Sequence, residues 1–414
     1  MLPGLPEGSW VETGTGLCYV AIRRYPPDHR HGSFPLKAFL EEPPDRWTPI
    51  ETREALGPLR PEALFFLDIE TTGLAGGAGT YAFLVGIGQF EDEKAFCIRQ
   101  VFLPSPAQEA ALLDTVAALL EPAEGLITFN GQGFDLPLLG TRYAMARRAC
   151  PWDGKAHLDL LPVARRLWRA RLPSCSLASL EEHLLGIDRD PMDISGYQIP
   201  SLYYAYLHQR DADILTPVFY HNAQDILSMV TLAVQIARLL RDPWSRRGPR
   251  HGPDFYALAR LYEARGNVEQ AVSAYRSALL FALPPEERER AWQRLSMLLK
   301  RLGAWEEAAE IWESLLERPG PHPLYAYVEL ARYYEHRRRD PERAAAIVQR
   351  AIAEYGECPR EDSLAHRLAR LRRKMRQEGI PRAPDAGARC AHGAAENGSR
   401  AADDFQTDRN GGTR

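Results

Sequence analysis

The order of apolar and polar residues in the first half of the chain predicts a mixed α/β domain. Short apolar runs at residues 64–69, 80–90 and 95–103, separated by turn-forming segments, predict a meander of three β-strands. Apolar side chains at positions 112, 113, 116, 119 and 120 then have the spacing of a helix over residues 107–120. The pattern continues with a strand and then helices, at residues 126–129, 134–147, 160–171 and 222–240. We therefore expect a mixed central sheet with helices against its faces.

The segments on either side of this domain have different patterns. Residues 1–60 are rich in proline and contain one apolar run, residues 17–22, which predicts a buried strand. We interpret them as an N-terminal extension packed on the main domain, residues 61–241. Residues 242–253 are rich in Pro, Gly and Arg and predict a linker. Residues 380–414 predict a disordered tail, because Phe405 is the one large hydrophobic residue beyond position 382.

The region between the linker and the tail, residues 254–379, repeats a helical pattern. Its first copy places apolar and small residues at 258, 259, 262, 266, 271, 275 and 278, a spacing that resembles the tetratricopeptide pattern. A second copy follows 37 residues later, and a third contains one inserted residue. Leu364, Leu368 and Leu371 predict a final capping helix. We expect an all-α, tetratricopeptide-type repeat domain whose stacked copies bury surfaces that one copy could not cover.

Composition narrows the class of protein and its compartment. The chain is 45% hydrophobic and 26% charged, as is usual for a globular protein. Its six cysteines are scattered with no Cys-x-x-Cys pair, which argues against a zinc ribbon or a disulfide framework and indicates a reducing, cytoplasmic compartment. No apolar run reaches the length of a membrane span, and the first residues lack the charged and apolar regions of a signal peptide. We therefore expect no membrane association.

Charge is distributed unevenly along the chain. Residues 1–240 contain 20 Lys and Arg against 29 Asp and Glu, whereas residues 241–382 contain 27 against 21. An acidic first half and a basic second half suit a nucleic-acid enzyme whose second module helps to hold the phosphate backbone. Solvated helix faces rich in arginine would explain the second half equally well.

Three acidic motifs carry the candidate chemistry. Asp68 and Glu70 stand two positions apart at the end of the first predicted strand, so both side chains point to the same face of the sheet. Such a pair also occurs where an ordinary strand ends at solvent, but two buried carboxylates side by side need a cation between them, and hard divalent cations prefer carboxylate oxygens. A second acid, Asp135, follows Asn130 after the strand at residues 126–129. A third, Asp225, stands at the head of the predicted last helix.

These three motifs, in this order, resemble the DEDD (DnaQ-like) exonuclease superfamily. Its acidic quartet maps onto Asp68, Glu70, Asp135 and Asp225. Residues 67–73, 81–86 and 196–200 are also similar to the bacterial YprB-type ribonuclease H-like proteins, and this likeness covers residues 15–240. The resemblance implies an α/β ribonuclease H-like domain with a mixed central sheet flanked by helices.

The resemblance also implies a function. It suggests a metal-dependent nuclease that hydrolyses phosphodiester bonds with two Mg²⁺ or Mn²⁺ ions, acting as a 3′–5′ exonuclease on single-stranded ends of DNA or RNA. Asp68 would bridge both ions, Glu70 and Asp225 would lie on one side, and Asp135 would lie on the other or act through water. The alternative is a catalytically idle scaffold that binds a protein partner or nucleic acid. Five further residues are candidates for substrate binding: Thr71, Thr72, Gly73, Asn130 and Phe134.

The general base is predicted less directly. The two subclasses of the superfamily place a His five residues before the last Asp or a Tyr four before it, whereas this chain has Tyr220 five before and His221 four before. We favour His221, because an unperturbed imidazole titrates near neutral pH and tyrosine only near 10. The alternative for His221 is a residue that caps the helix.

Three other features have competing interpretations. Asp159 either supports the metal site from outside or caps the helix that begins after it, and we favour the cap. Residues 77–82 match a dinucleotide-binding fingerprint, which we reject because a strand rather than a helix is predicted to follow. Five aromatic residues have two interpretations, stacking on unpaired bases or packing in the core, and we favour the core: Tyr197, Tyr203, Tyr204, Tyr206 and Phe219.

Overall fold

The computed structural model describes residues 4–42, 59–73, 79–91, 95–190, 193–245, 248–356 and 364–378. They form two compact units, Met1–Ala326 and Tyr327–Arg414. The first unit therefore contains the predicted α/β domain together with the first repeat helices, and the predicted boundaries at 60, 241 and 253 remain a prediction. Most of the glycine-rich loop, which we define as residues 73–79, lies outside the described residues. The predicted tail from residue 380 lies outside them as well.

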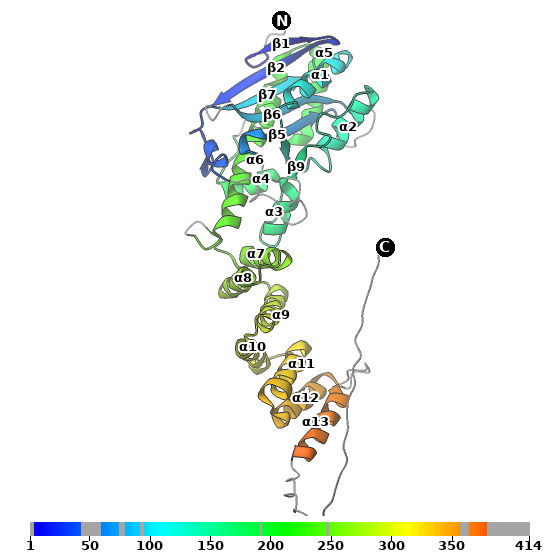
Figure 1. Cartoon of the computed structure of the whole chain (residues 1–414). Coiled ribbons are helices and arrows are strands. Elements are labelled where there is room, and N and C mark those ends of the chain that lie inside the picture. Colours follow the sequence, from blue (N-terminus) through cyan, green and yellow to red (C-terminus); the bar gives the residue numbers. More distant parts are fainter. Residues whose placement is uncertain are drawn as a thin grey trace, which may run out of the picture. The chain divides into compact units, whose positions relative to one another are not determined.

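A seven-stranded sheet organises the first unit (Figure 1). The strand order is β1-β2-β7-β6-β5-β8-β9, with β5 parallel to β8, β8 parallel to β9 and the other neighbours antiparallel. This is the predicted mixed sheet. The strands are β1 Gly8–Thr13, β2 Gly16–Tyr25, β5 Leu64–Thr71, β6 Ala82–Glu91, β7 Ala95–Phe102, β8 Gly125–Thr128 and β9 Ala156–Asp159; β3 Arg30–His31 and β4 Phe34–Pro35 form a separate small ribbon.

The N-terminal segment is an integral part of this sheet. The sequence predicts one strand there, packed on the main domain as an extension. In the structure, two strands of this segment belong to the seven-stranded sheet, because β2 pairs along β7 from Tyr19 to Tyr25 and β1 pairs in turn with β2. Val11 and Trp10 of β1 are only partly buried, and this half-exposed edge strand lacks the continuous apolar run by which β2 could be recognised.

Helices cover the sheet and connect its strands. They are α1 Glu109–Leu120, α2 Asp135–Met145, α3 Leu160–Trp168, α4 Leu177–Leu180, α5 Ile199–Gln209 and α6 Thr216–Arg241, with a π-helical turn at Glu181–Leu185. Short 3₁₀ turns lie at Leu36–Phe39, Pro61–Ala63, Pro106–Gln108, Gly196–Gln198 and Ala212–Leu215. Helix α6 begins six residues before the predicted start at Asn222. Strand β6 follows the fingerprint-like segment, as the rejection of dinucleotide binding requires.

Aromatic side chains fill the core between the sheet and α5–α6. The Tyr203 ring stacks on Phe83 with centroids 4.1 Å apart, and its hydroxyl donates to the carbonyl of Leu103. Tyr206 and Phe219 are equally buried, so for these three residues the core interpretation is confirmed. Tyr197 and Tyr204 lie outside this core, with 73% and 48% of their surface exposed.

Helix α6 is the longest element and runs through the core. Together with the preceding turn, residues Ala212–Arg241 form a 30-residue segment that is long and apolar enough to cross a membrane. The prediction that no apolar run reaches this length is therefore wrong. Because 78% of its apolar window is buried in the protein, and a core helix passes the same test, this is weak evidence for a span.

The repeat helices occur as predicted, in both units. In the first unit α7 Gly252–Ala264 pairs with α8 Val268–Leu280, and α9 Pro285–Arg301 pairs with α10 Trp305–Glu317. The turns use Gly266 and Gly303 at φ +76° and +81°, a conformation that glycine adopts without strain. The remaining helices are α11 Leu324–Tyr333, α12 Pro341–Tyr355 and α13 Leu364–Glu378.

The inserted residue of the third repeat has a structural counterpart. Between α11 and α12 the chain forms a π-helical turn, Tyr334–Arg338, followed by Arg339 at φ +53°. A π turn holds one more residue than an α turn, so it takes up the insertion without breaking the helix. The sequence register of the repeats is therefore kept on both sides of it.

Candidate active site

Asp68 and Glu70 lie on β5, the strand whose two neighbours differ in direction. Strand β6 runs antiparallel to β5 and β8 runs parallel, which places the carboxyl end of β8 at the end of β5 where the two acids stand. The pairing of β5 with β6 shifts register between Glu70 and Thr71. Glu70 is 9% exposed, and its carboxylate makes no hydrogen bond or ion pair with any of the described residues.

The carboxylate of Asp68 is held by a side chain from α6. Asp68, Gly86 and Gln100 lie opposite one another on β5, β6 and β7, and Asn222 packs above the middle strand. The Asn222 amide donates to Asp68 Oδ2 at 2.8 Å, and its Oδ1 accepts from Gln100 Nε2 at 2.8 Å. A Cβ at Gly86 would lie 2.2 Å from Asn222 Oδ1. The missing side chain of Gly86 therefore makes room for this relay from Gln100 to Asp68.

Asp135 reaches the same place from the start of α2. Its Oδ1 accepts a hydrogen bond of 3.2 Å from the backbone N–H of Ile69. Ile69 is the residue between Asp68 and Glu70 in the sequence. Its position in the first turn of α2 favours a negative charge, because free N–H groups of a helix point to its start. Burial, together with the nearby Asp159 and Asp225, outweighs these contacts and raises the pKa of Asp135 to about 7.

Asp225 and His221 lie one turn apart inside α6. The expectation that Asp225 stands at the head of this helix is wrong, because α6 begins at Thr216. The same fact excludes His221 as a helix cap. Four residues apart, the two side chains lie on one face of the helix, with His221 Nε2 3.7 Å from Asp225 Oδ2.

Arg189 occupies the centre of a second group of acids next to Asp225. Its guanidinium donates to Asp225 at 2.7 Å, to Asp193 at 2.8 Å and to Glu181 at 3.0 Å. Glu181 and Asp193 are 1% and 6% exposed, so the cation is needed to offset their burial. Burial alone lowers the pKa of Arg189, but the bond to Glu181 and the attraction of Asp225 outweigh it and raise the pKa.

The imidazole of His221 is oriented by Asp193. His221 Nδ1 lies 2.8 Å from Asp193 Oδ1, so the tautomer that donates from Nδ1 leaves Nε2 as an acceptor on the side of Asp225. Tyr220 points elsewhere along the helix, and its phenol makes no hydrogen bond to the four predicted acids among the described residues. Burial, then the nearby Asp190 and Asp193, raise the pKa of Tyr220 further above neutrality. This geometry places the histidine, not the tyrosine, beside the acids.

Like charges dominate the whole site. Burial raises the pKa of Asp68 and of Glu70, and the other carboxylates of the quartet raise both further. Burial also raises the pKa of Asp225, although His221 and Arg189 oppose the shift. Each acid therefore stabilises the protonated form of its neighbours, and a cation would relieve that cost.

Comparison with known proteins identifies the family. Residues 65–237 match the model of the RNase H superfamily, and residues 255–289 match a tetratricopeptide repeat. Over 365 residues the chain is 32% identical to YprB of Bacillus subtilis (strain 168), a protein described as uncharacterized, and the match covers 86% of each chain. The chain belongs to the YprB family. The expectation of an RNase H-like domain followed by tetratricopeptide repeats is thereby confirmed.

Membership of the YprB family and the RNase H superfamily raises the question of a divalent metal. The donor set fits one, because burial and neighbouring quartet acids together raise the pKa of Asp68, Glu70 and Asp135, and Glu70 makes no hydrogen bond to any described residue. The present arrangement does not complete a centre: within the described residues, no three His, Cys, Asp or Glu side chains are grouped so that they could hold an ion. Asp225 is instead bound to Arg189.

The residues predicted to contact substrate lie around these acids, with different surroundings. The Thr71 hydroxyl donates to the carbonyl of Gly73, and Thr72 Oγ1 accepts from the N–H of Tyr81, so both threonines brace the start of the glycine-rich loop. Phe134 packs against the hydrophobic core. Asn130 is exposed and has φ +66°.

Asp159 has the capping role that we favoured, and a second one. Its carboxylate accepts from the N–H of Leu161 at the start of α3, which confirms the cap. It also accepts from the N–H groups of Asn130 and Gln132 at 2.8 and 3.0 Å. Asp159 therefore fastens the loop that leads into Asp135.

Several residues of the YprB-family site were not found from the sequence. Asn222 and Gln100 had a usable signal, since an isolated glycine in an apolar strand, here Gly86, indicates close approach of another group. Glu181, Arg189 and Asp193 had none, because they lie in a segment of short turns without periodic pattern.

Proposed function

We propose that this protein is a metal-dependent nuclease that hydrolyses phosphodiester bonds, acting as a 3′–5′ exonuclease on single-stranded ends. The observation that supports it most is the meeting of three acids from β5 and α2 without a cation among the described residues: the partly buried Asp68 and the buried Glu70 and Asp135. Mg²⁺ or Mn²⁺ ions held by these acids and Asp225 would supply an activated water and stabilise the leaving oxygen.

The chain's own groups have separate tasks in this proposal. Asn222 fixes the orientation of the Asp68 carboxylate, and the N–H of Ile69 fixes that of Asp135. His221 Nε2 accepts the proton lost by the attacking water, while Asp193 holds the other ring nitrogen. Thr71 and Thr72 brace the glycine-rich loop, whose backbone can approach the terminal nucleotide.

The competing function is an idle nuclease-like scaffold that binds a protein through its repeats. Tetratricopeptide repeats favour protein interaction in general, and the repeats of this chain suit that role as well. The acid cluster argues against an idle domain, because buried like charges cost stability and a scaffold gains nothing from keeping them.

The test is cleavage of end-labelled single- and double-stranded DNA and RNA by the full chain with Mn²⁺ or Mg²⁺. We expect stepwise shortening from the 3′ end, abolished by Asp68→Asn with the fold intact. Asp153→Asn, at an exposed aspartate outside the site, is the matched control and should cleave like the wild type. Cleavage that survives in purified Asp68→Asn protein, or no cleavage of any substrate by the wild type, would refute the proposal.

A further inference from the structure

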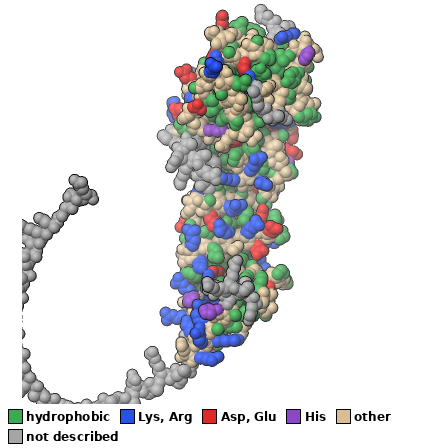
Figure 2. Space-filling model, turned by 90° about the vertical axis from the view of Figure 1, so that its right-hand side faces the viewer, with side chains coloured by type: hydrophobic (Ala, Val, Ile, Leu, Met, Phe, Trp, Pro, Cys, Tyr) green, Lys and Arg blue, Asp and Glu red, His purple; other side chains and the backbone are tan. Residues whose placement is uncertain are grey.

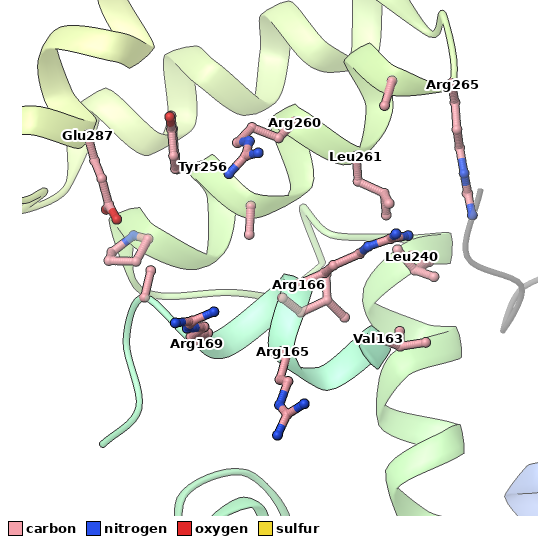
Figure 3. A pocket seen from close by; sticks show the side chains of 15 residues that line it. Val163, Arg165, Arg166, Arg169, Leu240, Tyr256, Arg260, Leu261, Arg265 and Glu287 are labelled. Atoms are coloured by element: carbon pink, nitrogen blue, oxygen red, sulfur yellow. The ribbon is translucent and has the colours of Figure 1, made fainter. Parts of the chain in front are cut away.

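A large cavity lies away from the acids, between α3 and α7 (Figure 3). It encloses about 680 Å³ and is lined by 15 residues. Among them are five arginines against one acid, Glu287. The arginines come from both walls: Arg165, Arg166 and Arg169 from α3, and Arg260 and Arg265 from α7 and its end. We call this cavity the arginine groove.

Three of the five arginines that line the groove are exposed and form no ion pair with a carboxylate in the described part of the chain: Arg165, Arg169 and Arg260. Arg171, three residues after the α3 helix ends, is different: it donates to Asp254 on α7 at 2.8 Å. Arg171 thus ties the segment after α3 to α7 through a neutralising ion pair, whereas Arg169 and Arg260 have no carboxylate partner among the described residues.

Figure 3 shows how the walls face each other. Arg260 comes down from α7, and Arg166 and Arg169 come from α3 on the opposite side, whereas Arg165 points away from α7 in this view. The lining also includes apolar side chains, among them Val163, Leu240 and Leu261, which lie to the right of Arg260 and Arg169 in this view. Guanidinium groups on two facing elements, with apolar surface beside them, suit a strand that presents phosphates to the arginines and sugar or base faces to the apolar side chains.

Helix α3 links the groove to the acid cluster. Asp159 caps its start and binds the loop that leads to Asp135. Arg166 and Arg169 follow Asp159 by seven and ten positions, which at 1.5 Å per helical residue is about 10 to 15 Å. A strand that leaves the acids must therefore extend over at least this distance before its phosphates reach these arginines.

We propose that the arginine groove binds the phosphodiester backbone of the substrate strand a few nucleotides away from the end held at the acids. The inference rests on the proposed nuclease function, and it names the part of the protein that selects strands over mononucleotides. It also assigns the first repeat, through α7, to substrate binding. Figure 2 shows that Lys and Arg side chains are frequent over the helical part of the visible face, which favours contact with a polyanion.

The test compares two triple variants of the full chain with matched charge. In the groove variant Arg166, Arg169 and Arg260 become Ala; in the control Arg24, Arg276 and Arg301, which are exposed and do not line the groove, become Ala. Binding of fluorescein-labelled oligothymidylate of about 20 nucleotides is measured by anisotropy in EDTA, so that no probe is cleaved. Circular dichroism melting verifies that both variants are folded.

We expect the groove variant to lose at least tenfold in affinity for the long oligonucleotide, and the control less than twofold. The slope of log K against log salt should fall by about 2, as for the loss of three phosphate contacts on a single strand. Replacing the same three arginines by Lys should restore most of the affinity, because the charge returns. Equal binding by the groove and control variants would overturn the inference. So would a groove that binds poly-aspartate peptide in preference to oligonucleotide, since that would indicate an acidic protein partner.

Cleavage assays separate this inference from the proposed function. With Mn²⁺, the groove variant should show a raised KM and an unchanged kcat on the long substrate, and wild-type rates on a dinucleotide, which cannot reach the groove. Arginine-dependent binding without cleavage by the wild type would retain the groove and refute the nuclease. Cleavage that is equally efficient in the groove variant would retain the nuclease and refute the groove.

Discussion

The acidic site has two halves that solve the same electrostatic problem differently. In the sheet half, Asp68, Glu70 and Asp135 converge from β5 and α2 with no cation among the described residues. In the arginine half, Glu181, Asp193 and Asp225 surround Arg189. The sheet half can lower its energy by taking up protons or a cation from solution, whereas the arginine half already contains one. The sheet half is therefore the half whose acids still favour the binding of a cation.

The largest effect on activity outside the quartet should come from the histidine that lies between the two halves. His221→Ala should reduce turnover by roughly 10²–10⁴-fold, because Nε2 no longer accepts the proton. Tyr220→Phe on the same helix is the matched control and should have a small effect. The measurement is kcat against pH at saturating Mn²⁺. A crippled Tyr220→Phe together with a nearly normal His221→Ala would show that the tyrosine is the base.

Removing Arg189 should leave the acids of the arginine half without a cation, as the acids of the sheet half already are. Arg189→Met leaves Glu181 and Asp193 buried without their partner, so we expect a loss of about 3–5 kcal/mol in unfolding free energy in the absence of metal. Arg24→Met, which breaks an exposed pair with Glu91, should cost no more than about 1 kcal/mol. Urea denaturation of both variants measures this difference.

The same variant distinguishes two roles of Asp225. If this acid is shared between arginine and metal, Mn²⁺ should raise the Tm of Arg189→Met more than that of the wild type, because Asp225 is released from its ion pair. An equal or smaller rise would mean that Asp225 belongs to the arginine half alone.

The sheet half was predictable from the sequence, whereas in the arginine half only Asp225 was, for physical reasons. Asp68, Glu70 and Asp135 follow apolar strands, and strand periodicity shows where such residues lie. Arg189 belongs to a segment whose contacts are set by a π turn and by residues up to 36 positions away, and no periodic pattern encodes these. The start of α6 was misplaced because the residues from Thr216 to His221 contain Pro217, which is acceptable in a first helical turn but was not recognised as such.

A smaller effect should follow from loosening the sheet half without removing an acid. Asn222→Ala deletes the donor to Asp68 and leaves Gln100 with the carbonyl of Phe219 as its remaining acceptor, so we expect a 10- to 100-fold weaker apparent affinity for Mn²⁺. Ser228→Ala, at another buried polar position of the same helix, serves as the control. Isothermal titration calorimetry gives both affinities, and equal values would show that the relay does not orient Asp68.

The smallest effect concerns pH. A carboxyl group with a raised pKa binds its proton more tightly when folded, so it stabilises the fold at low pH and loses that contribution as pH rises through its folded pKa. For Asp135 the window runs from about 4 to about 7. Without metal, the Tm difference between wild type and Asp135→Asn should therefore move against the wild type between pH 5 and 8. A difference that is constant across this range would show that Asp135 is not protonated near neutrality.

The glycine at position 86 has a consequence for interpreting other genomes. Because a Cβ there would lie 2.2 Å from Asn222 Oδ1, the alanine that a single nucleotide change introduces would displace the amide from Asp68 while every acid of the quartet remained in place. A related open reading frame could thus retain all four acids and still encode a disabled protein. When only a sequence has been determined, the residue at the position of Gly86, opposite Asp68, therefore indicates whether the acidic site is intact.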